Sequence, residues 1–334
     1  MDLDLVFFGT AGSMPTAQRA PSALLLRRGA DKLLFDCGEG TQRQMLRSTV
    51  GLIELREIFL THYHADHYLG LPGMLKTFAL RGRELPMTIY GPPGLSDLFA
   101  ALRRIFGKLT YPYELVTVRP GDVLERGEYR LEAFAPNHGL SSVGWALIEE
   151  PRPGRFDAEA AEALAIPIGP ERGALQRGEA VTLPDGRVIT PDMLVGTPRP
   201  GRKLVITGDT APSPVVAEMT RGADVLVHEA TFAEEERERA RETMHSTATD
   251  AAEIAREAEV GLLVLTHLSN RYFGPEIARE ARDIFPETVV PRDFDAVEVP
   301  FPERGAPRLV KGAVAGRRVE SGAPEPVTTV EETA

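Results

Sequence analysis

The sequence predicts an α/β fold built from two similar halves. Short apolar runs that end in clusters of polar residues alternate along the 334 residues with segments of helical periodicity. Two of these runs share one plan, since residues 58–62 (Ile-Phe-Leu-Thr-His) and 263–267 (Leu-Val-Leu-Thr-His) both read as a buried strand followed by Thr-His. Two half-domains that face one another across a common site would produce this repetition.

The N-terminal elements are predicted strands. Residues 3–8 alternate and then become continuously apolar, a turn cluster occupies residues 9–13, and residues 22–27 and 32–36 read as two further strands. The segment Gly-Glu-Gly-Thr-Gln at residues 38–42 then opens a helix, and we interpret both of its glycines as tight-turn residues.

The most informative stretch, Thr-His-Tyr-His-Ala-Asp-His, follows the apolar strand at residues 58–60. It places four potential metal ligands within six residues: His62, His64, Asp66 and His67. Imidazole nitrogen and carboxylate oxygen suit zinc. A solvated turn is the alternative, but titratable groups cluster in this way mainly at functional sites. Because residues two apart can face one ion while the next pair faces another, the spacing favours two metal ions.

Basic residues follow this stretch. Residues 71–118 read as helix, strand and helix, with the strand at 87–91 and the second helix at 95–109. Each charge by itself is typical of a solvated helix face. As a group beside a metal site they are candidate phosphate contacts. They are Lys76, Arg81, Arg83, Arg103, Arg104 and Lys108.

Residues 151–203 interrupt the pattern. Proline and glycine make up 15 of these 53 residues, a composition typical of loops or disorder, and apolar periodicity persists only around residues 158–164. A segment this long inside a compact domain is usually functional or disordered. Its net charge is +1, against −11 for the whole chain, and Arg199, Arg202 and Lys203 form a basic cluster at its end.

Further candidate site residues stand where predicted strands end or a helix begins. They are His138 after the strand 129–135, Asp209 after the strand 203–207, Glu229 in the run 224–232, His245 before the helix 248–258, and His267 after the strand 262–265. Structural roles are the alternatives, because Asp209 could cap a helix and His245 could merely neighbour a cap at Ser246 or Thr247. Residues 234–242 read as a charged, solvated helix.

The composition of the chain limits which classes of protein it can belong to. The chain is 43% hydrophobic, enough for a sizeable core, and no run of 18 apolar residues predicts a membrane helix. Cys37 is the only cysteine, which excludes an internal disulfide, and the acidic start is unlike a secretory signal, so we expect a cytoplasmic protein. The net charge of −11 argues against a uniformly nucleic-acid-binding surface but permits local phosphate contacts.

Three segments resemble the ribonuclease Z family of the metallo-β-lactamase superfamily: residues 8–16 (Phe-Gly-Thr-Ala-Gly-Ser-Met-Pro-Thr), 35–42 (Phe-Asp-Cys-Gly-Glu-Gly-Thr-Gln) and 61–73 (Thr-His-Tyr-His-Ala-Asp-His-Tyr-Leu-Gly-Leu-Pro-Gly). Residues 166–175 (Ile-Pro-Ile-Gly-Pro-Glu-Arg-Gly-Ala-Leu) are similar to the projecting arm with which bacterial members grip the tRNA elbow. The chain departs from the family at Arg19-Ala20-Pro21, where Arg-Asn is usual. The resemblance implies an α/β metallo-β-lactamase fold, an αββα four-layer sandwich, over residues 1–304. Residues 151–203 would be the inserted tRNA-binding arm. For residues 305–334 the composition predicts a disordered tail, because the strand pattern ends after Pro302 and residues 313–334 are rich in Gly, Pro, Glu and Thr.

The resemblance also implies the roles of the site residues. His62, His64 and His138 would hold one metal and Asp66, His67 and His267 the other, with Asp209 bridging the two. Two Zn²⁺ ions per chain are implied, although the same ligands tolerate Mn²⁺ or other divalent metals. Asp66 would also accept a proton, and His245, oriented by Glu229, would give one to the leaving 3′ oxygen.

The implied activity is that of an endoribonuclease which removes the 3′ trailer from precursor tRNA, leaving a 3′ hydroxyl on the tRNA and a 5′ phosphate on the trailer. Related bacterial enzymes point to a homodimer, and no membrane partner is expected. Two alternatives stay open. One is a small-molecule hydrolase of the same superfamily, which has no need of residues 151–203. The other is an RNA-binding module without activity, against which the filled positions of His245 and Glu229 weigh.

Overall fold

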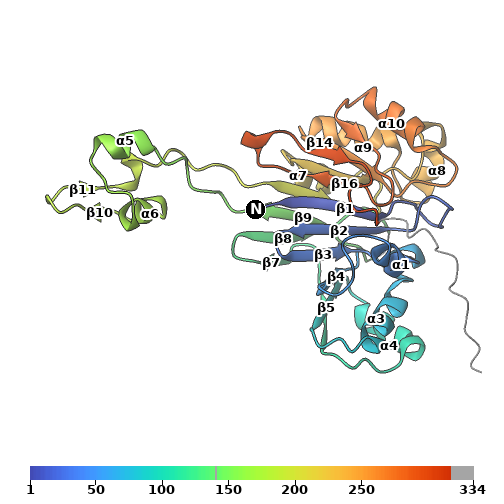
Figure 1. The fold of residues 1–334 in the computed structure, drawn as a ribbon. Helices are drawn as coiled ribbons and strands as arrows, with labels where there is room; N and C mark the ends of the chain where they lie inside the picture. Colours follow the sequence, from blue (N-terminus) through green and yellow to red (C-terminus); the bar gives the residue numbers. More distant parts are fainter. Residues whose placement is uncertain (140, 317–334) are drawn as a thin grey trace, which may run out of the picture.

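The computed structural model describes residues 1–139 and 141–316, which form two packed β-sheets (Figure 1). The first sheet contains, in spatial order, β17 (Arg308–Val310), β16 (Ala296–Glu298), β1 (Leu3–Gly9), β2 (Ala23–Arg28), β3 (Asp31–Phe35), β4 (Glu57–Phe59), β5 (Met87–Gly91) and β6 (Tyr113–Thr117). The second contains β15 (Thr288–Val289), β14 (Leu262–Thr266), β13 (Val225–Glu229), β12 (Lys203–Ile206), β9 (Gly144–Glu149), β8 (Tyr129–Phe134) and β7 (Val123–Glu125). Each sheet has one parallel side, β3 to β6 in the first and β12 to β15 in the second.

Apolar side chains fill the layer between the sheets. Alternate residues of β1 point to opposite faces, so that Leu5 joins the cluster between the sheets and Val6 joins the cluster under the outer helices. Phe59 lies in the inner layer, where its ring stacks on Tyr90 at 4.4 Å between centroids and meets the edge of Trp145 from the opposite sheet at 5.1 Å. The continuous apolar runs in the sequence are explained by burial on both strand faces.

Helices cover both outer faces, which confirms the predicted αββα sandwich (Figure 1). The first sheet carries α1 (Thr41–Leu46), α3 (Leu71–Leu80) and α4 (Leu95–Phe106), and the second carries α7 (Pro214–Thr220), α9 (Ala248–Glu257) and α10 (Gly274–Arg282). Two short helices, α2 (Ala65–Tyr68) and α8 (Arg237–Glu242), lie at the connections. The predicted cap of α9 is Thr247, which forms a reciprocal capping box with Asp250. No helix among the described residues is long and apolar enough to cross a membrane.

Residues 151–203 form a small folded arm that projects from the sandwich (Figure 1). The arm contains α5 (Ala158–Ala163), α6 (Pro170–Gln176), a hairpin of β10 (Val181–Thr182) and β11 (Val188–Ile189), and the 3₁₀ turn η1 (Pro191–Met193). Its own apolar core consists of Ala161, Ile166, Leu175, Leu183, Ile189 and Leu194. Two antiparallel bridges, Arg152 to Arg199 and Phe156 to Val195, form its stalk. The loop-like reading of the composition is wrong for most of this segment, because its core residues are spaced too irregularly to give a periodic signal.

The sandwich continues past residue 304. β17 pairs with β16 in antiparallel register, with Leu309 opposite Val297, and Gly316 N donates to Arg47 O at 2.9 Å. The predicted disordered tail is therefore corrected for residues 305–316, which bond to the first sheet although their strand is only three residues long. Residues 317–334 of that predicted tail lie outside the described residues.

Candidate metal centre

The predicted ligands gather at one edge of the sandwich, where strands of both sheets end. They are His62 after β4, His64, Asp66 and His67 at α2, His138 after β8, Asp209 after β12, and His267 after β14. Strands β4, β12 and β14 belong to the parallel sides of their sheets, and the carboxyl ends of parallel strands are the usual place for a binding crevice. Gly208, with a φ of 64°, brings the two halves together, because a Cβ there would lie 3.1 Å from the Cβ of Thr61.

Asp209 is the centre of the cluster. Its Oδ2 atom lies 3.3 Å from the Nε2 atoms of both His67 and His267, 3.6 Å from that of His62 and 3.8 Å from that of His138. One carboxylate oxygen thus faces four imidazoles that come from both half-domains. The alternative role as a helix cap does not hold, because the side chain of Ser213 caps α7, the helix that follows β12.

Three groups of side chains bring their ligand atoms within 4.8 Å of one another in the described part of the chain. They are His62, His64 and His138 with Asp209; Asp66 and His67 with His267; and Asp209 with His245 and His267. The first two groups are the two predicted ligand sets, and the third adds the predicted proton donor. Within the first group, His64 turns its Nδ1 inward, 3.2 Å from His138 Nε2.

The donor set fits divalent cations. His62 Nε2 is buried and has no hydrogen-bond partner among the described residues. In the metal-free protein, burial and the neighbouring charge of His67 lower the pKa of His62 to about 2, so this imidazole is a neutral donor. His67 Nε2 and His267 Nε2 approach to 3.2 Å. A cation coordinated by these nitrogens and by Asp209 would satisfy all of them, and zinc accepts both atom types.

Asp36, which the sequence analysis did not select, positions His67. Its Oδ2 atom lies 2.7 Å from His67 Nδ1, and its Oδ1 atom accepts the Thr61 backbone N–H at 2.8 Å. Burial opposes a charge on His67, but the carboxylates of Asp209 and Asp36 outweigh it and raise the pKa of His67 well above its usual value in the metal-free protein. Its position at the end of the predicted strand 32–36, like that of Asp209 at the end of its own strand, was the available signal.

The imidazole rings of His138 and His267 are each oriented by a hydrogen bond at the Nδ1 atom, the nitrogen that does not face Asp209. His138 Nδ1 donates to the Met244 carbonyl at 2.8 Å, which leaves Nε2 as the lone-pair atom that faces Asp209. His267 Nδ1 lies 2.8 Å from Thr231 Oγ1. Partners of this kind fix the ring and its tautomer, and sequence spacing gave no indication of either.

His245 and Glu229 form a buried pair beside the ligands. His245 Nδ1 lies 2.7 Å from Glu229 Oε1, and the carboxylate also accepts the Thr210 backbone N–H at 2.8 Å. Burial opposes a charge on His245, but Glu229 outweighs it and raises the pKa of His245 to about 9 in the metal-free protein. The ring centroid of His245 lies 4.8 Å from that of His138 and 5.6 Å from that of His267, so the pair borders both ligand groups.

Asp66 is the most accessible carboxylate of the cluster. The turn after β1 approaches it, because Ser13 N donates to its Oδ2 atom at 2.7 Å. Burial acts against ionisation of Asp66, but the hydrogen bond from His267 and the charge of His67 outweigh it and lower the pKa of this carboxyl. The side chain is therefore an anion at neutral pH.

The basic cluster at the end of the implied tRNA-binding arm was a candidate RNA contact, but its three side chains bind groups of the protein itself. Arg202 is 1% exposed, and its guanidinium binds both oxygens of Glu149. Arg199 pairs with Glu303 at 2.9 Å, and Lys203 Nζ donates to the Arg221 carbonyl. These three cations stabilise the base of the arm.

Of the other candidate phosphate contacts, Arg83 is also engaged, since it donates to the Leu55 and Pro86 carbonyls and stacks on the Phe78 ring. The remaining five are exposed: Lys76, Arg81, Arg103, Arg104 and Lys108. His228 lies outside the centre, since it is fully buried and its Nδ1 contacts the Glu229 carbonyl.

Comparisons with known proteins agree with this geometry. The family model described as the metallo-beta-lactamase superfamily matches residues 17–267. The chain is 45% identical to the ribonuclease Z of Methanosarcina acetivorans over 303 residues, 90% of this chain and 99% of the relative. It is 48% identical to the ribonuclease Z of Myxococcus xanthus over 271 residues, 81% of this chain and 88% of the relative. The crystal structure of the human short form of tRNase Z superposes with a TM-score of 0.63 at 27% identity, covering 89% of this chain and 99% of that one.

The chain therefore has the fold of the metallo-β-lactamase superfamily, with a cluster of potential metal ligands at one edge of the sandwich. Within that superfamily it belongs to the ribonuclease Z family. The predicted enzyme class, a hydrolytic endoribonuclease, is confirmed at the level of the family. The fold alone is more widely shared, since the YhfI protein of Bacillus subtilis superposes with a TM-score of 0.66 at 20% identity over 89% of this chain and the whole of that one.

Proposed function

We propose that this protein is a zinc-dependent endoribonuclease that removes the 3′ trailer from precursor tRNA, leaving a 3′ hydroxyl on the tRNA and a 5′ phosphate on the trailer. The observation that carries the proposal is the presence, at one edge, of a cluster of ligands around Asp209 and a separate His245–Glu229 pair beside it. The names of the relatives, ribonuclease Z and human tRNase Z, support tRNA as the substrate.

Two Zn²⁺ ions are the proposed occupants of the centre. His62, His64 and His138 would bind one, Asp66, His67 and His267 the other, and Asp209 would bridge them. When bound, the pair of cations polarises a phosphodiester and lowers the pKa of water. The same nitrogen and carboxylate set also suits Mn²⁺.

The protein's own groups would then move the protons. Asp66 is anionic and held in place by Ser13 N, so it can accept the proton of the attacking water. His245 keeps Nδ1 turned to Glu229, which leaves its Nε2 as the atom that protonates the leaving 3′ oxygen. Division of the roles between an ionised carboxylate and a protonated imidazole is the usual solution for acid–base chemistry at neutral pH.

The arm is the proposed site for the body of the tRNA, and a homodimer is the proposed assembly. The stalk leaves the sandwich after β9 and returns before β12, whereas Asp209 follows the opposite end of β12. RNA held by one arm would therefore reach the metal centre of a second chain more readily than that of its own chain. A solution mass equal to one chain, 36.5 kDa, would contradict the dimer.

Cleavage of a 3′-extended tRNA transcript, with both new ends mapped, tests the function. We expect a single cut at the 3′ side of the acceptor stem, a 3′ hydroxyl on the tRNA, and loss of activity when a chelator removes the metals. Hydrolysis of bis(p-nitrophenyl) phosphate without any cleavage of the transcript would instead favour a small-molecule phosphodiesterase.

A further inference from the structure

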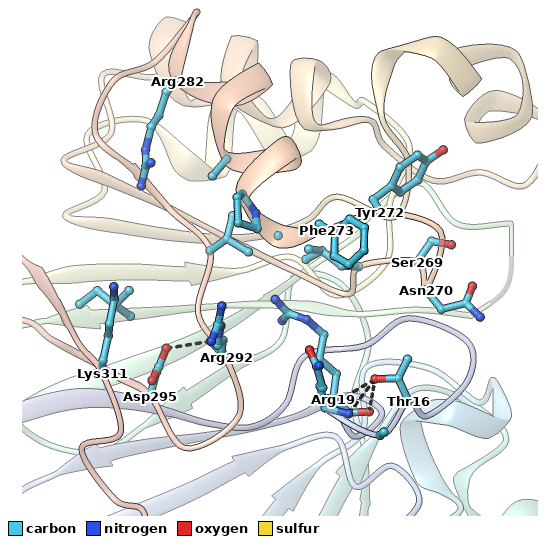
Figure 2. Close-up of a pocket in the computed structure, with 18 residues that line it drawn as sticks. Thr16, Arg19, Ser269, Asn270, Tyr272, Phe273, Arg282, Arg292, Asp295 and Lys311 are labelled. Atoms are coloured by element: carbon cyan, nitrogen blue, oxygen red, sulfur yellow. Dashed lines mark hydrogen bonds between the residues drawn. The ribbon is translucent and has the colours of Figure 1, made fainter.

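A groove lies beside the segment that follows the proposed ligand His267 (Figure 2). Leu268 and Ser269, which directly follow the proposed ligand His267, belong to its lining. Ser269 lies near one end and Lys311 at the other. The loop at residues 16–19 and the segment 268–275 form its walls, and its volume is about 700 Å³. We call this feature the 268–311 groove.

Four cationic side chains line the 268–311 groove: Arg19, Arg282, Arg292 and Lys311. Asp295 is the one acidic residue in this lining, and it is buried and accepts the backbone N–H groups of Arg292 and Gly312. Within residues 1–139 and 141–316, no ion pair engages the side chains of Arg292 or Lys311. In a chain with a net charge of −11, this is a local concentration of positive charge.

The positive surface continues on the other side of the loop at residues 16–19. A neighbouring cavity of about 730 Å³ shares Arg19 and Arg292 with the 268–311 groove and adds Arg43 and Arg47, together with the acidic residues Glu39 and Asp293. Arg19 itself is held rigidly, since its Nη1 atom donates to Thr10 Oγ1 and to the Pro291 carbonyl. The two cavities together are lined by six cationic side chains and three acidic ones, so they present a predominantly cationic strip.

An exposed aromatic ring stands over this strip. Phe273 is 75% exposed at the wall of the groove (Figure 2), and the next residue, Gly274, lies so close to Arg19 that a Cβ there would be 2.8 Å from its Nη2 atom. A single exposed apolar residue has no meaning by itself. An aromatic face beside a row of cations, however, is how proteins hold single-stranded nucleic acid, because bases stack on the ring while phosphates meet the charges.

We propose that the 268–311 groove binds the unpaired 3′ trailer of the precursor, with phosphates on Arg292 and Lys311 and a base on Phe273. This inference rests on the proposed function. RNA on the tRNA side of the cut soon enters a base-paired stem, which offers no free base face, whereas the trailer continues unpaired. Leu268 and Ser269 in the groove lining directly follow the proposed ligand His267, so RNA that leaves the centre would have a short path to the groove.

The test compares two precursors that differ only in the trailer, one with a single nucleotide and one with about ten unpaired nucleotides, a length within the usual site size of such grooves. For the long trailer, Phe273→Ala should raise KM about tenfold, as expected for one lost stacked base, with kcat unchanged. Phe273→Tyr should restore the parent value. For the single-nucleotide trailer, all three proteins should have the same KM.

A second experiment tests the cationic side chains with the double variant Arg292→Gln, Lys311→Gln. Loss of two phosphate contacts should weaken binding of a labelled single-stranded RNA and reduce the salt slope, d log K/d log[salt], by about 1.4 in magnitude. The matched control is Arg279→Gln with Arg304→Gln, which removes the same charge from exposed positions outside the groove lining. Two outcomes would contradict trailer binding in the 268–311 groove: equal effects of the two double variants, or equal KM values for the parent and Phe273→Ala with the long trailer. If the parent protein binds single-stranded RNA through Phe273 but cuts neither precursor, RNA binding in the groove is supported and the proposed function is contradicted.

Discussion

His245 and His267 are held by the same buried carboxylate. His245 Nδ1 contacts Glu229 Oε1 directly at 2.7 Å, and Thr231 Oγ1 links Glu229 Oε2, at 2.5 Å, to His267 Nδ1, at 2.8 Å. Glu229 is 1% exposed at the end of β13. The end of β13 thereby fixes the proposed proton donor, His245, relative to a proposed metal ligand, His267. Because the two histidines contact Glu229 by different routes, replacing His245 leaves the link to His267 intact.

The first prediction concerns the proton donor. His245→Ala should lower the rate of precursor tRNA cleavage by about 10²- to 10⁴-fold, the usual contribution of a general acid or base, while metal content stays the same. Hydrolysis of bis(p-nitrophenyl) phosphate should change little, because its leaving group departs as a stable anion and needs no proton. Metal loss in this variant, measured by elemental analysis, would make His245 a ligand instead.

The second prediction concerns the bridge. Asp209→Ala should lose most of both metal ions, because its Oδ2 atom faces histidines of both ligand groups. Elemental analysis after dialysis at a controlled free zinc concentration gives the stoichiometry of the parent and the variant. A parent protein that saturates at one ion per chain would rule out the two-metal centre.

The third prediction concerns Asp36. Asp36→Asn should weaken metal affinity by about 10- to 100-fold, the usual effect of losing a carboxylate behind a ligand histidine, because His67 loses its anionic partner. Titration of activity against free zinc in chelator buffers measures the shift. Asp31→Asn, at the exposed start of the same strand, is the matched control and should leave the titration unchanged. Identical curves for both variants and the parent would show that Asp36 does not tune the site.

Some of this site could be read from sequence, and some could not. The pattern of ligands at strand ends was readable, because a strand fixes where its terminal residue points and the parallel strands deliver their ends to one edge. Asp36 was not selected although it also stands at the end of a predicted strand, and the role of Thr231 depends on a contact that no periodicity encodes. The basic cluster of Arg199, Arg202 and Lys203 was wrongly read as a candidate RNA contact. A sequence does not show that a cation has a buried partner in another strand, as Arg202 has in Glu149.

The fold shows the same division. The predicted bounds of β1, β8, β14 and α9 agree with the structure to within one or two residues. β1 and β14 are apolar runs buried on both faces, β8 alternates apolar and polar residues, and α9 is amphipathic and begins at a capping box. Short strands such as β16 and β17 were missed, since three residues carry no measurable alternation. The predicted helix 95–109 ends at Phe106, where Gly107 adopts a φ of 72° and terminates it.

The fourth prediction concerns stability at the base of the arm. Glu149→Gln should destabilise the protein by about 3–5 kcal/mol at neutral pH, because it leaves the buried guanidinium of Arg202 without an anion and leaves Arg28 with only the exposed Glu128. Burial opposes ionisation of Glu149, but hydrogen bonds from the two arginines outweigh it and lower its pKa below the usual 4.5. Its contribution is therefore complete above pH 4.5 and is lost as the pH falls through the lowered pKa.

Urea unfolding of parent and variant across this range checks both statements. The difference in stability should be largest near neutral pH and should narrow in acid. Glu303→Gln is the control, since Glu303 also pairs with two arginines of the stalk but at the surface, where ion pairs contribute little. An effect of Glu303→Gln as large as that of Glu149→Gln would contradict the importance of burial.

The last prediction separates tRNA processing from general phosphodiester hydrolysis. Replacing residues 157–194 by a short Gly/Ser linker removes the head of the arm and keeps its stalk, because Asp157 N donates to Leu194 O at 2.7 Å and the two ends already meet. No proposed ligand lies in the deleted part, so metal content and hydrolysis of bis(p-nitrophenyl) phosphate should stay unchanged. Processing of precursor tRNA should fall sharply, mainly through KM, since binding energy far from the cut is visible only to a large substrate.

The structure also limits what this deletion can do to the salt dependence. In the described part of the arm head, Arg177 and Arg187 are exposed but lie beside Glu179 and Asp185, and Arg172 donates to the Ile166 carbonyl. The salt slope should therefore drop by no more than about 3, the value for three duplex phosphate contacts. Ile168 is 85% exposed at the arm, so Ile168→Asp offers a point variant that should reproduce part of the KM increase. If the deletion variant processes precursor tRNA as well as the parent does, the arm does not bind the substrate, and the small-molecule hydrolase becomes the better account of the metal centre.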